Sequence, residues 1–351
     1  MTNFGHEMQM RRLYIITFIL IVVATVAGCR KNAGGVDNPQ PSAYYWRTVF
    51  SLDSCEKAFV NDNGIKRLYV RYFDVVMRDS VPMPNATLRF DQPFPDGVEV
   101  VPTVFIMENC MGGSLDGVAA KLVDRVLQMN ETNDVKGVRE IQIDCDWTLN
   151  SQKKYFAFLT QVDSILDSHN MRLSVTIRLH QLATAPPPAD YGVLMMYNTG
   201  KVDPKGDRNP ILDIRDVKPY LRHLSRYDLP LCSAWPCFGW NLLYSGNQFK
   251  AFLYDVNLDE KSVYRQVAPG HRVVIANRSL PEPNSDGSDY TTVAIGDSVI
   301  TVRPTANQIL SIVDELERER PGINNQVVIY SVDNKNINKY DKQFFKTLFA
   351  R

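Results

Sequence analysis

Short runs of β-branched and aromatic residues alternate with longer amphipathic stretches along most of this 351-residue chain. The short runs predict buried strands, and the stretches between them have the 3.6-residue apolar period of helices. The predicted strands are Trp46–Leu52, Arg67–Phe73, Val101–Met107, Glu140–Cys145, Arg172–Arg178, Gly192–Tyr197, Leu229–Trp235 and Gln326–Ser331. The predicted helices are Leu115–Met129, Ser151–Ser168, Asp213–Arg226, Thr305–Arg320 and Lys339–Phe349.

This alternation predicts a parallel sheet, and the number of strands favours a closed (β/α)8 barrel of the TIM type. The alternative is an open doubly wound sheet, which usually carries a glycine-rich phosphate turn after its first strand. The segment Ser51–Cys55 contains no such turn. Between the seventh and eighth strands, residues 239–325 are expected to form an insertion over the barrel mouth. Within it, Tyr290–Ile295 and Ser298–Val302 flank Gly296-Asp297, which predicts a β-hairpin.

The N-terminal segment has the pattern of a bacterial export signal. Arg11 and Arg12 precede the apolar run Leu13–Gly28, whose 16 residues are few for a membrane-spanning helix and typical of a signal-peptide core. The small residues directly before Cys29 resemble a lipobox, in which the cysteine is diacylated and the chain is cut before it. We therefore expect residues 1–28 to be a signal peptide and Cys29 to be lipidated. An uncleaved N-terminal anchor is the alternative.

The residues after Cys29 indicate a destination. Arg30, where an inner-membrane signal would have Asp, resembles an outer-membrane sorting signal. The acidic cluster typical of surface export in Bacteroidetes lipoproteins is missing, so we expect the periplasmic face of the outer membrane, with the cell surface as the alternative. Residues 29–43 are rich in glycine and proline and predict a flexible tether between the lipid bilayer and one barrel domain, residues 44–351.

Composition and charge exclude several classes of partner. Lys plus Arg and Asp plus Glu both number 39, and there is no basic block, which argues against nucleic acid. The 44% of hydrophobic and 22% of charged residues argue against disorder. No CxxC motif and no histidine pair with metal-ligand spacing occur, so we expect neither a metal nor another cofactor. The cysteines after position 29 lie mostly in apolar runs, which favours buried free thiols.

Polar and aromatic residues gather at the carboxyl ends of the predicted strands, where a TIM barrel carries its chemistry. Aromatic rings stack on sugar faces and carboxylates supply acid–base catalysis, so the pattern indicates a glycan as partner. The candidate residues at these strand ends are Arg71, Glu108, Asp144, Asp146, Trp147, Arg178, His180, Tyr197, Asn198 and Trp235.

The fourth predicted strand gives the most specific signal. Its two-residue period puts Gln142, Asp144 and Asp146 on one face, inside the barrel. Polar side chains there are costly unless they are paired. Two neighbouring carboxylates also repel each other, which favours protonation of one of them. The alternative to a catalytic role is a structural network, for example with Arg178 on the adjacent strand.

Several of the other candidates also have a structural alternative. His180 shares a predicted strand face with Arg178 and contacts either the ligand or a structural hydrogen-bond partner. Arg71 contacts the ligand or pairs with Glu108 across neighbouring strands. The tryptophans either stack on sugars or belong to the core; they are Trp147, Trp235 and Trp240.

Two strand ends resemble those of family-18 chitinases, which carry Asp-x-Asp-x-Glu after the fourth strand and Met-x-Tyr-Asp/Asn after the sixth. Met195–Asn198 matches the second motif fully, whereas Gln142–Asp146 keeps only the central Asp of the first. The resemblance implies substrate-assisted hydrolysis, in which the N-acetyl oxygen of the sugar attacks the anomeric carbon. Asp146 would then protonate the leaving oxygen, Asp144 would orient the acetamide, and Tyr197 would donate a hydrogen bond to the acetamide oxygen.

A wider pattern, residues 68–74, 142–146 and 173–176, resembles a family of Bacteroidetes-type TIM-barrel lipoproteins with no established activity.

Asp146 stands where the chitinases have Glu, and its side chain reaches roughly 1.5 Å less far. A misplacement on the order of 1 Å can cost about 100-fold in rate. Two functions therefore stay open, a glycoside hydrolase and a catalytically silent glycan-binding barrel, with a structural envelope protein as the third. In either of the first two, Asp144, Asp146, Tyr197 and Asn198 are expected to line one pocket.

Overall fold

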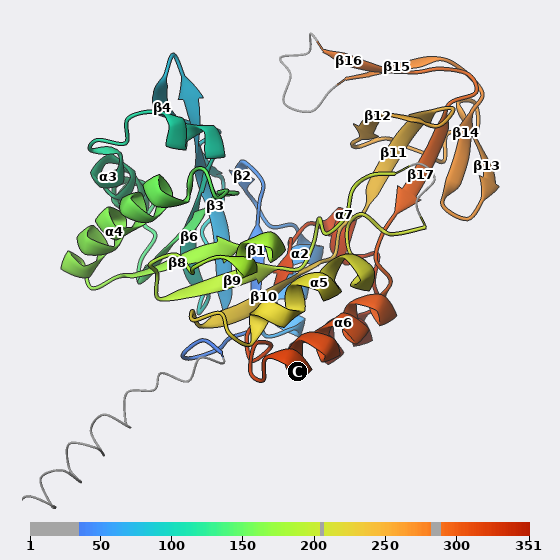
Figure 1. The fold of residues 1–351 in the computed structure, drawn as a ribbon. Helices are drawn as coiled ribbons and strands as arrows, with labels where there is room; N and C mark the ends of the chain where they lie inside the picture. Colours follow the sequence, from blue (N-terminus) through green and yellow to red (C-terminus); the bar gives the residue numbers. More distant parts are fainter. Residues whose placement is uncertain (1–34, 204–206, 282–288) are drawn as a thin grey trace, which may run out of the picture. The chain divides into compact units, whose positions relative to one another are not determined.

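The computed structural model describes residues 35–203, 207–281 and 289–351, and all structural statements concern these residues. The predicted signal peptide and Cys29 lie outside them. Eight parallel strands form a closed barrel, because β1 pairs with both β3 and β18 (Figure 1). In order around the barrel they are β1 (Ser42–Tyr45), β3 (Arg67–Arg78), β6 (Glu99–Ile106), β7 (Glu140–Asp144), β8 (Arg172–Ile177), β9 (Tyr191–Met195), β10 (Leu231–Pro236) and β18 (Val327–Tyr330). The predicted (β/α)8 fold is confirmed.

The first barrel strand differs from the predicted one. It is Ser42–Tyr45, not Trp46–Leu52, and it begins inside the segment expected to be a flexible tether. All four of its residues are buried, because Tyr44 packs inside the barrel while Ala43 and Tyr45 pack under the helices. Within the predicted strand only β2 (Val49–Phe50) is extended, and it pairs with β5 (Arg89–Phe90) outside the barrel.

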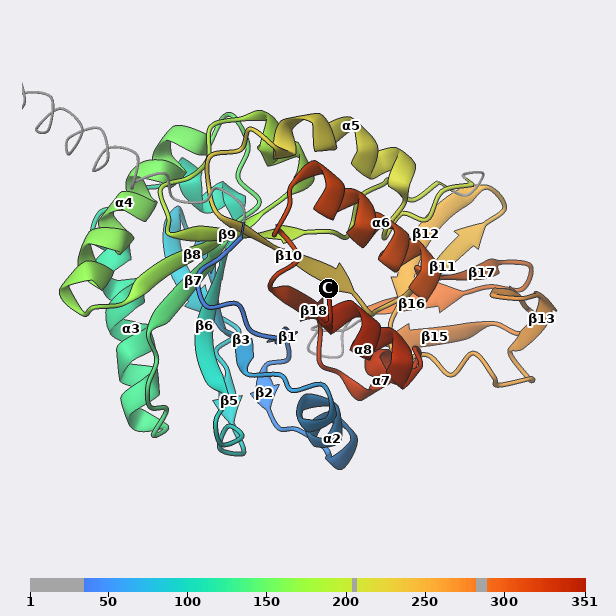
Figure 2. The same ribbon diagram turned by 90° about the horizontal axis from the view of Figure 1, so that it is seen from below.

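Helices surround the barrel, as the view along it shows (Figure 2). They are α2 (Ser54–Asp62), α3 (Val118–Thr132), α4 (Gln152–Ser168), α5 (Ile214–Leu224), α6 (Ala306–Glu319), α7 (Asn334–Ile337) and α8 (Lys342–Phe349). The start of α6 is fixed by a capping box between Thr305 and Gln308. Other connections carry further structure: β4 (Val81–Asn85) and β5 follow β3, and the 3-10 helices Glu108–Gly112 and Leu179–Ala183 follow β6 and β8. None of the helices that the structure describes is long and apolar enough to cross a membrane.

A hydrogen-bonded network fills the amino-terminal end of the barrel; we call its members, Arg67, Tyr69, Glu140, Tyr191 and Gln326, the floor network. Arg67 donates to Gln326 Oε1 at 2.7 Å, and Gln326 donates to the Tyr69 hydroxyl at 2.9 Å. The Tyr69 and Tyr191 hydroxyls lie 2.6 Å apart, and Tyr191 donates to Glu140 at 2.6 Å. All five side chains are buried, so each polar group has a partner in place of water.

The expected insertion follows β10 and forms its own five-stranded antiparallel sheet. Across this sheet the strands are β12 (Gln248–Leu253), β11 (Trp240–Ser245), β17 (Ser298–Val302), β14 (His271–Val274) and β13 (Tyr264–Ala268). The inserted strands end at Val302, and α6, which the predicted range included, packs on the barrel core.

The predicted hairpin at Gly296-Asp297 is wrong. The strand before that turn, β16 (Tyr290–Val293), pairs with β15 (Arg278–Pro281) in a separate two-stranded sheet. The strand after it, β17, pairs with β11 and β14. The backbones of Gly296 and Asp297 are instead hydrogen-bonded to Val274, so the turn leads the chain from one sheet into another.

The cysteines after position 29 are all free thiols. Cys110, Cys145, Cys232 and Cys237 are buried, in agreement with the expectation, and Cys55 is exposed.

Candidate functional site

One arginine bridges the two aspartates of the predicted site. Asp144 is the last residue of β7, Asp146 follows two positions later, and Arg178 follows β8 directly. Arg178 Nη2 donates to Asp144 Oδ1 at 3.1 Å, and Arg178 Nε forms a close ion pair with Asp146 Oδ1. The Asp144 side chain is buried, whereas 55% of the Asp146 side chain is exposed. The network with Arg178 that the sequence offered as an alternative is therefore present.

Burial dominates the electrostatics of Asp144. It raises the pKa of this carboxyl above the ordinary aspartate value, against the opposing effects of Arg178 and of Thr176. The Thr176 hydroxyl donates to Asp144 Oδ1 at 2.5 Å. Asp144 is therefore a carboxyl that takes up a proton at higher pH than an exposed aspartate does.

A second ion pair at the mouth comes from β3. Arg71 Nε donates to Asp74 Oδ1 at 2.7 Å, although residues three apart on a regular strand face opposite sides. The pairing of β3 with β6 shifts register between Arg71 and Phe73, which turns Asp74 to the side of Arg71. The alternative that Arg71 pairs with Glu108 is wrong, because Arg71 pairs with Asp74 and Glu108 accepts a hydrogen bond from Thr148 at 3.1 Å.

Aromatic rings from four strand ends lie together at the mouth. The Tyr197 and Tyr330 ring centroids are 4.8 Å apart, and Trp46 lies 5.6 Å from Tyr330. Phe238, which follows β10, is 5.7 Å from Tyr197, and the Arg71 guanidinium lies 5.9 Å from the Trp46 ring. The sequence interpretation missed Trp46 and Tyr330. Once β1 is placed at Ser42–Tyr45, Trp46 is the residue at its carboxyl end.

Tyr197 belongs to the mouth, whereas its predicted companion Asn198 lines another pocket. Burial raises the pKa of Tyr197, so its hydroxyl stays a neutral donor, and it donates to Met195 Sδ at 3.1 Å. Asn198 has a positive φ of 56° and lines a surface pocket with Lys201 and Asp216.

Three other predicted contact residues lie elsewhere. Trp147 and Trp235 are fully buried and belong to the core between barrel and helices, so they offer no face to a ligand. Trp147 packs on Tyr155 and Phe156, and Trp235 Nε1 donates to Ser233 Oγ at 2.8 Å. His180 is exposed but lies on the 3-10 helix after β8, so it does not continue the strand face of Arg178.

Gln142 is structural. Its side-chain oxygen accepts from the Tyr44 hydroxyl at 2.8 Å inside the barrel, one layer below Asp144. In the described part of the chain, no group of three or more His, Cys, Asp or Glu side chains is arranged to hold a metal ion.

Solved structures with the same fold include chitinase-like enzymes. The spore cortex-lytic enzyme SleL of Bacillus megaterium aligns with a TM-score of 0.52 and 12% identity, over 90% of this chain and 75% of that enzyme. A chitinase from Chromobacterium violaceum aligns with the same score and identity, over 89% of this chain and 98% of the other. No family model and no curated protein matches the sequence. The chain therefore shares the (β/α)8 fold of these enzymes, and identities this low carry no further statement about activity.

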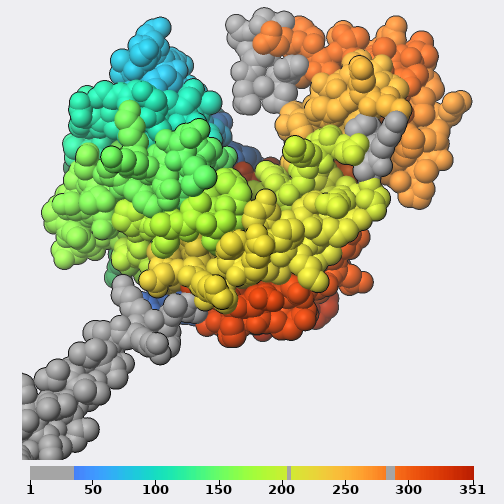
Figure 3. Space-filling view, in the orientation of Figure 1, coloured from blue at the N-terminus to red at the C-terminus, as the bar shows by residue number. Residues whose placement is uncertain are grey.

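The barrel mouth lies between two projections. Figure 3 shows the described surface hollowed between the blue tip of the β3–β4 hairpin and the orange insertion.

The mouth combines half-buried aromatic rings, two arginines and three aspartates at the carboxyl ends of barrel strands. This combination can stack on sugar faces and exchange hydrogen bonds with hydroxyl groups.

Proposed function

We propose that this chain is a membrane-anchored envelope lipoprotein whose barrel mouth binds a glycan without hydrolysing it. The observation that carries the proposal is the position of Arg178 between Asp144 and Asp146. A general acid must present a proton to the leaving oxygen. Asp146 Oδ1 instead accepts the Arg178 N–H, so this oxygen is already engaged by the arginine. Its shorter side chain, compared with the chitinase Glu, supports the same conclusion.

The rest of the mouth supports sugar recognition. Trp46 and Tyr330 are half-buried, so part of each ring is available for stacking. Arg71 and Asp74 are paired with each other and present further donors and acceptors beside the rings. The chitinase-like fold supports an N-acetylated glycan as the first class to test.

Hydrolysis is the second candidate function, and one observation favours it. Burial raises the pKa of Asp144, so this carboxyl holds a proton up to a higher pH than an exposed aspartate does, close to Tyr197 and Asp146. In that mechanism Asp146 acts as the acid, Asp144 orients the acetamide and Tyr197 hydrogen-bonds the acetamide oxygen. Arg178 would have to leave Asp146 when substrate binds.

A paired assay of binding and hydrolysis tests the proposal. Binding and hydrolysis are measured on N-acetylchito-oligosaccharides, peptidoglycan fragments and host-type glycans. The proteins compared are the wild type, Asp146→Asn and the control Lys121→Ala, which changes an exposed residue of α3. We expect wild-type binding with no products, and at most a modest change of affinity in Asp146→Asn. Turnover that disappears in Asp146→Asn would establish the hydrolase instead. Absence of any binding would contradict both functions.

The anchoring part of the proposal rests on the sequence around Cys29 and is tested separately. We expect the protein in the outer-membrane fraction, protected from added protease in intact cells. Digestion in intact cells would indicate the cell surface instead of the periplasmic face.

A further inference from the structure

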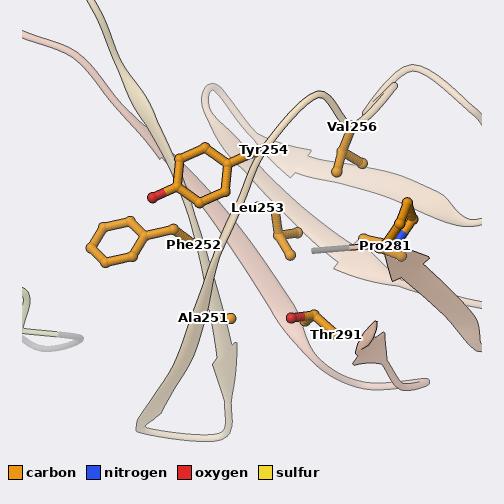
Figure 4. A pocket seen from close by; sticks show the side chains of 8 residues that line it. Ala251, Phe252, Leu253, Tyr254, Val256, Pro281 and Thr291 are labelled. Atoms are coloured by element: carbon orange, nitrogen blue, oxygen red, sulfur yellow. The ribbon is translucent and has the colours of Figure 1, made fainter. Parts of the chain in front are cut away.

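The insertion presents a row of aromatic side chains on the face of its sheet that does not form its core. Leu243 of β11 and Leu253 of β12 point into the insertion core. Phe252, next to Leu253 in the chain, points to the other side of β12 (Figure 4). The same row includes Tyr254, 54% exposed, and Phe249, 38% exposed. Apolar side chains this exposed, gathered on one face, mark an interaction surface.

A β-bulge creates this row. Phe249 and Phe252 are three residues apart, so a regular strand would turn them to opposite faces. The pairing of β12 with β11 shifts here, because Leu243 pairs with Ala251 whereas Tyr244 pairs with Phe249. The extra residue, Lys250, returns Phe249 to the side of Phe252, and the two ring centroids are 5.0 Å apart.

The row continues to the barrel mouth. Phe252 lies 5.0 Å from Trp240, and Trp240 lies 6.0 Å from Phe238. Phe238 is in turn 5.9 Å from Tyr330. We call Phe238, Trp240, Phe252, Phe249 and Tyr254 the aromatic track. Its steps are of the same order as the length of one sugar unit.

We propose that the aromatic track extends the mouth onto the insertion and binds a linear, uncharged glycan of several sugar units. This inference rests on the proposed function, because the track begins at the rings of the mouth. Flat rings in sequence stack on successive sugar faces. The charge beside the track is neutralised within the protein, since Lys250 pairs with Asp297 at 2.8 Å and Asp255 pairs with Lys335. Continuity with the mouth favours a glycan over a protein strand added to the edge strand β12.

The track predicts that affinity increases with glycan length. Isothermal titration with N-acetylchitobiose and N-acetylchitohexaose is performed on the wild type and on Phe249→Ala/Tyr254→Ala. Both changed side chains lie on the exposed face, so the insertion core stays intact. We expect the double variant to weaken hexaose binding by about 10-fold or more, from the loss of two stacking contacts, with disaccharide binding unchanged. Phe249→Tyr/Tyr254→Phe keeps both rings and should bind as the wild type does.

Control variants separate the track from the mouth. Ile295→Ala removes a still more exposed apolar side chain elsewhere on the insertion and should change nothing. Tyr330→Ala removes a ring of the mouth and should weaken both oligosaccharides. Equal wild-type affinity for both lengths, or unchanged hexaose binding in the double variant, would overturn the track and leave the proposed function intact. If only the track variant loses binding, the glycan site is on the insertion and the proposed role of the mouth is wrong. If the wild type binds neither oligosaccharide nor any of the glycans screened above, both the track and the proposed function are wrong.

Discussion

Replacing Arg178 by Gln should destabilise the protein in a pH-dependent way. Arg178 is the cation that Asp144 contacts, and the Asp144 side chain is only 5% exposed. The substitution leaves a buried carboxylate without its counter-charge, so the pKa of Asp144 rises further above its ordinary value. Asp146 loses the same partner, but it is half exposed and water replaces the arginine there at little cost.

The size of the effect follows from the burial of the pair. Removing one partner of a fully buried ion pair costs about 3–5 kcal/mol. Arg178 is 21% exposed and the Thr176 hydroxyl still donates to Asp144, so we expect about 2–3 kcal/mol at neutral pH. This corresponds to a fall in Tm of roughly 5 °C for a domain of this size.

The sign of the pH dependence is fixed by the raised pKa. The variant is penalised only while Asp144 is ionised in the wild type, so the difference is greatest at high pH and shrinks as the pH falls through the pKa of Asp144 in the variant and then through its lower, still raised pKa in the wild type. Urea denaturation at pH 7.5 and 4.5 measures it. Asp144→Asn/Arg178→Gln should recover most of the lost stability, because no carboxylate remains to be left unpaired. An equal loss at both pH values, or no recovery in the double variant, would refute the assignment of Arg178 as the counter-charge.

Three further predictions concern the anchor, the core and the mouth. Cys29→Ser should release the protein from the membrane fraction or leave it unprocessed, which fractionation and intact-mass measurement detect; a membrane-bound Ser variant of mature mass would contradict lipidation. Trp235→Phe should lower the free energy of unfolding, measured by urea denaturation, by about 1–3 kcal/mol, because the buried site loses side-chain volume and the hydrogen bond to Ser233. Glycan affinity should stay unchanged. Weakened glycan binding in the folded variant would return Trp235 to the site. Trp46→Ala should lower glycan affinity by roughly 5- to 10-fold in titration, because one stacking face is lost; wild-type affinity would remove Trp46 from the mouth.

The barrel was predictable because its strands are buried on both sides. Such strands appear in the sequence as short apolar runs separated by helical periods, and seven of the eight were placed within a few residues. The first strand was not predictable at its observed position, because its four residues follow Pro39 and Pro41 and only its pairing with β3 and β18 defines it. The predicted hairpin at Gly296-Asp297 is wrong for the same reason. A turn signal at Gly296-Asp297 is local, and which strands then pair is decided by the rest of the sheet.

The candidate site was predictable where it depends on strand period alone. The two-residue period of the strands predicted that Gln142 and Asp144 lie inside the barrel and that Arg178 can pair with Asp144. It could not reveal the bulge that turns Asp74 toward Arg71, because an extra residue in a strand leaves no signal in the apolar pattern. It also could not separate buried tryptophans from those at the mouth. In the core, the indole N–H of Trp235 donates to the hydroxyl of Ser233, two residues earlier in the chain.

The floor network determines how a long polymer can reach this protein. Arg67, Gln326, Tyr69, Tyr191 and Glu140 fill the amino-terminal end of the barrel with mutual hydrogen bonds, so the barrel is closed at that end. A polymer therefore cannot pass through the barrel, and it must approach and leave on the side of the mouth. A chain held at the rim therefore passes across it with both ends free. In the proposed function, the protein would attach at internal positions of a cross-linked or very long polysaccharide, where no chain end is within reach.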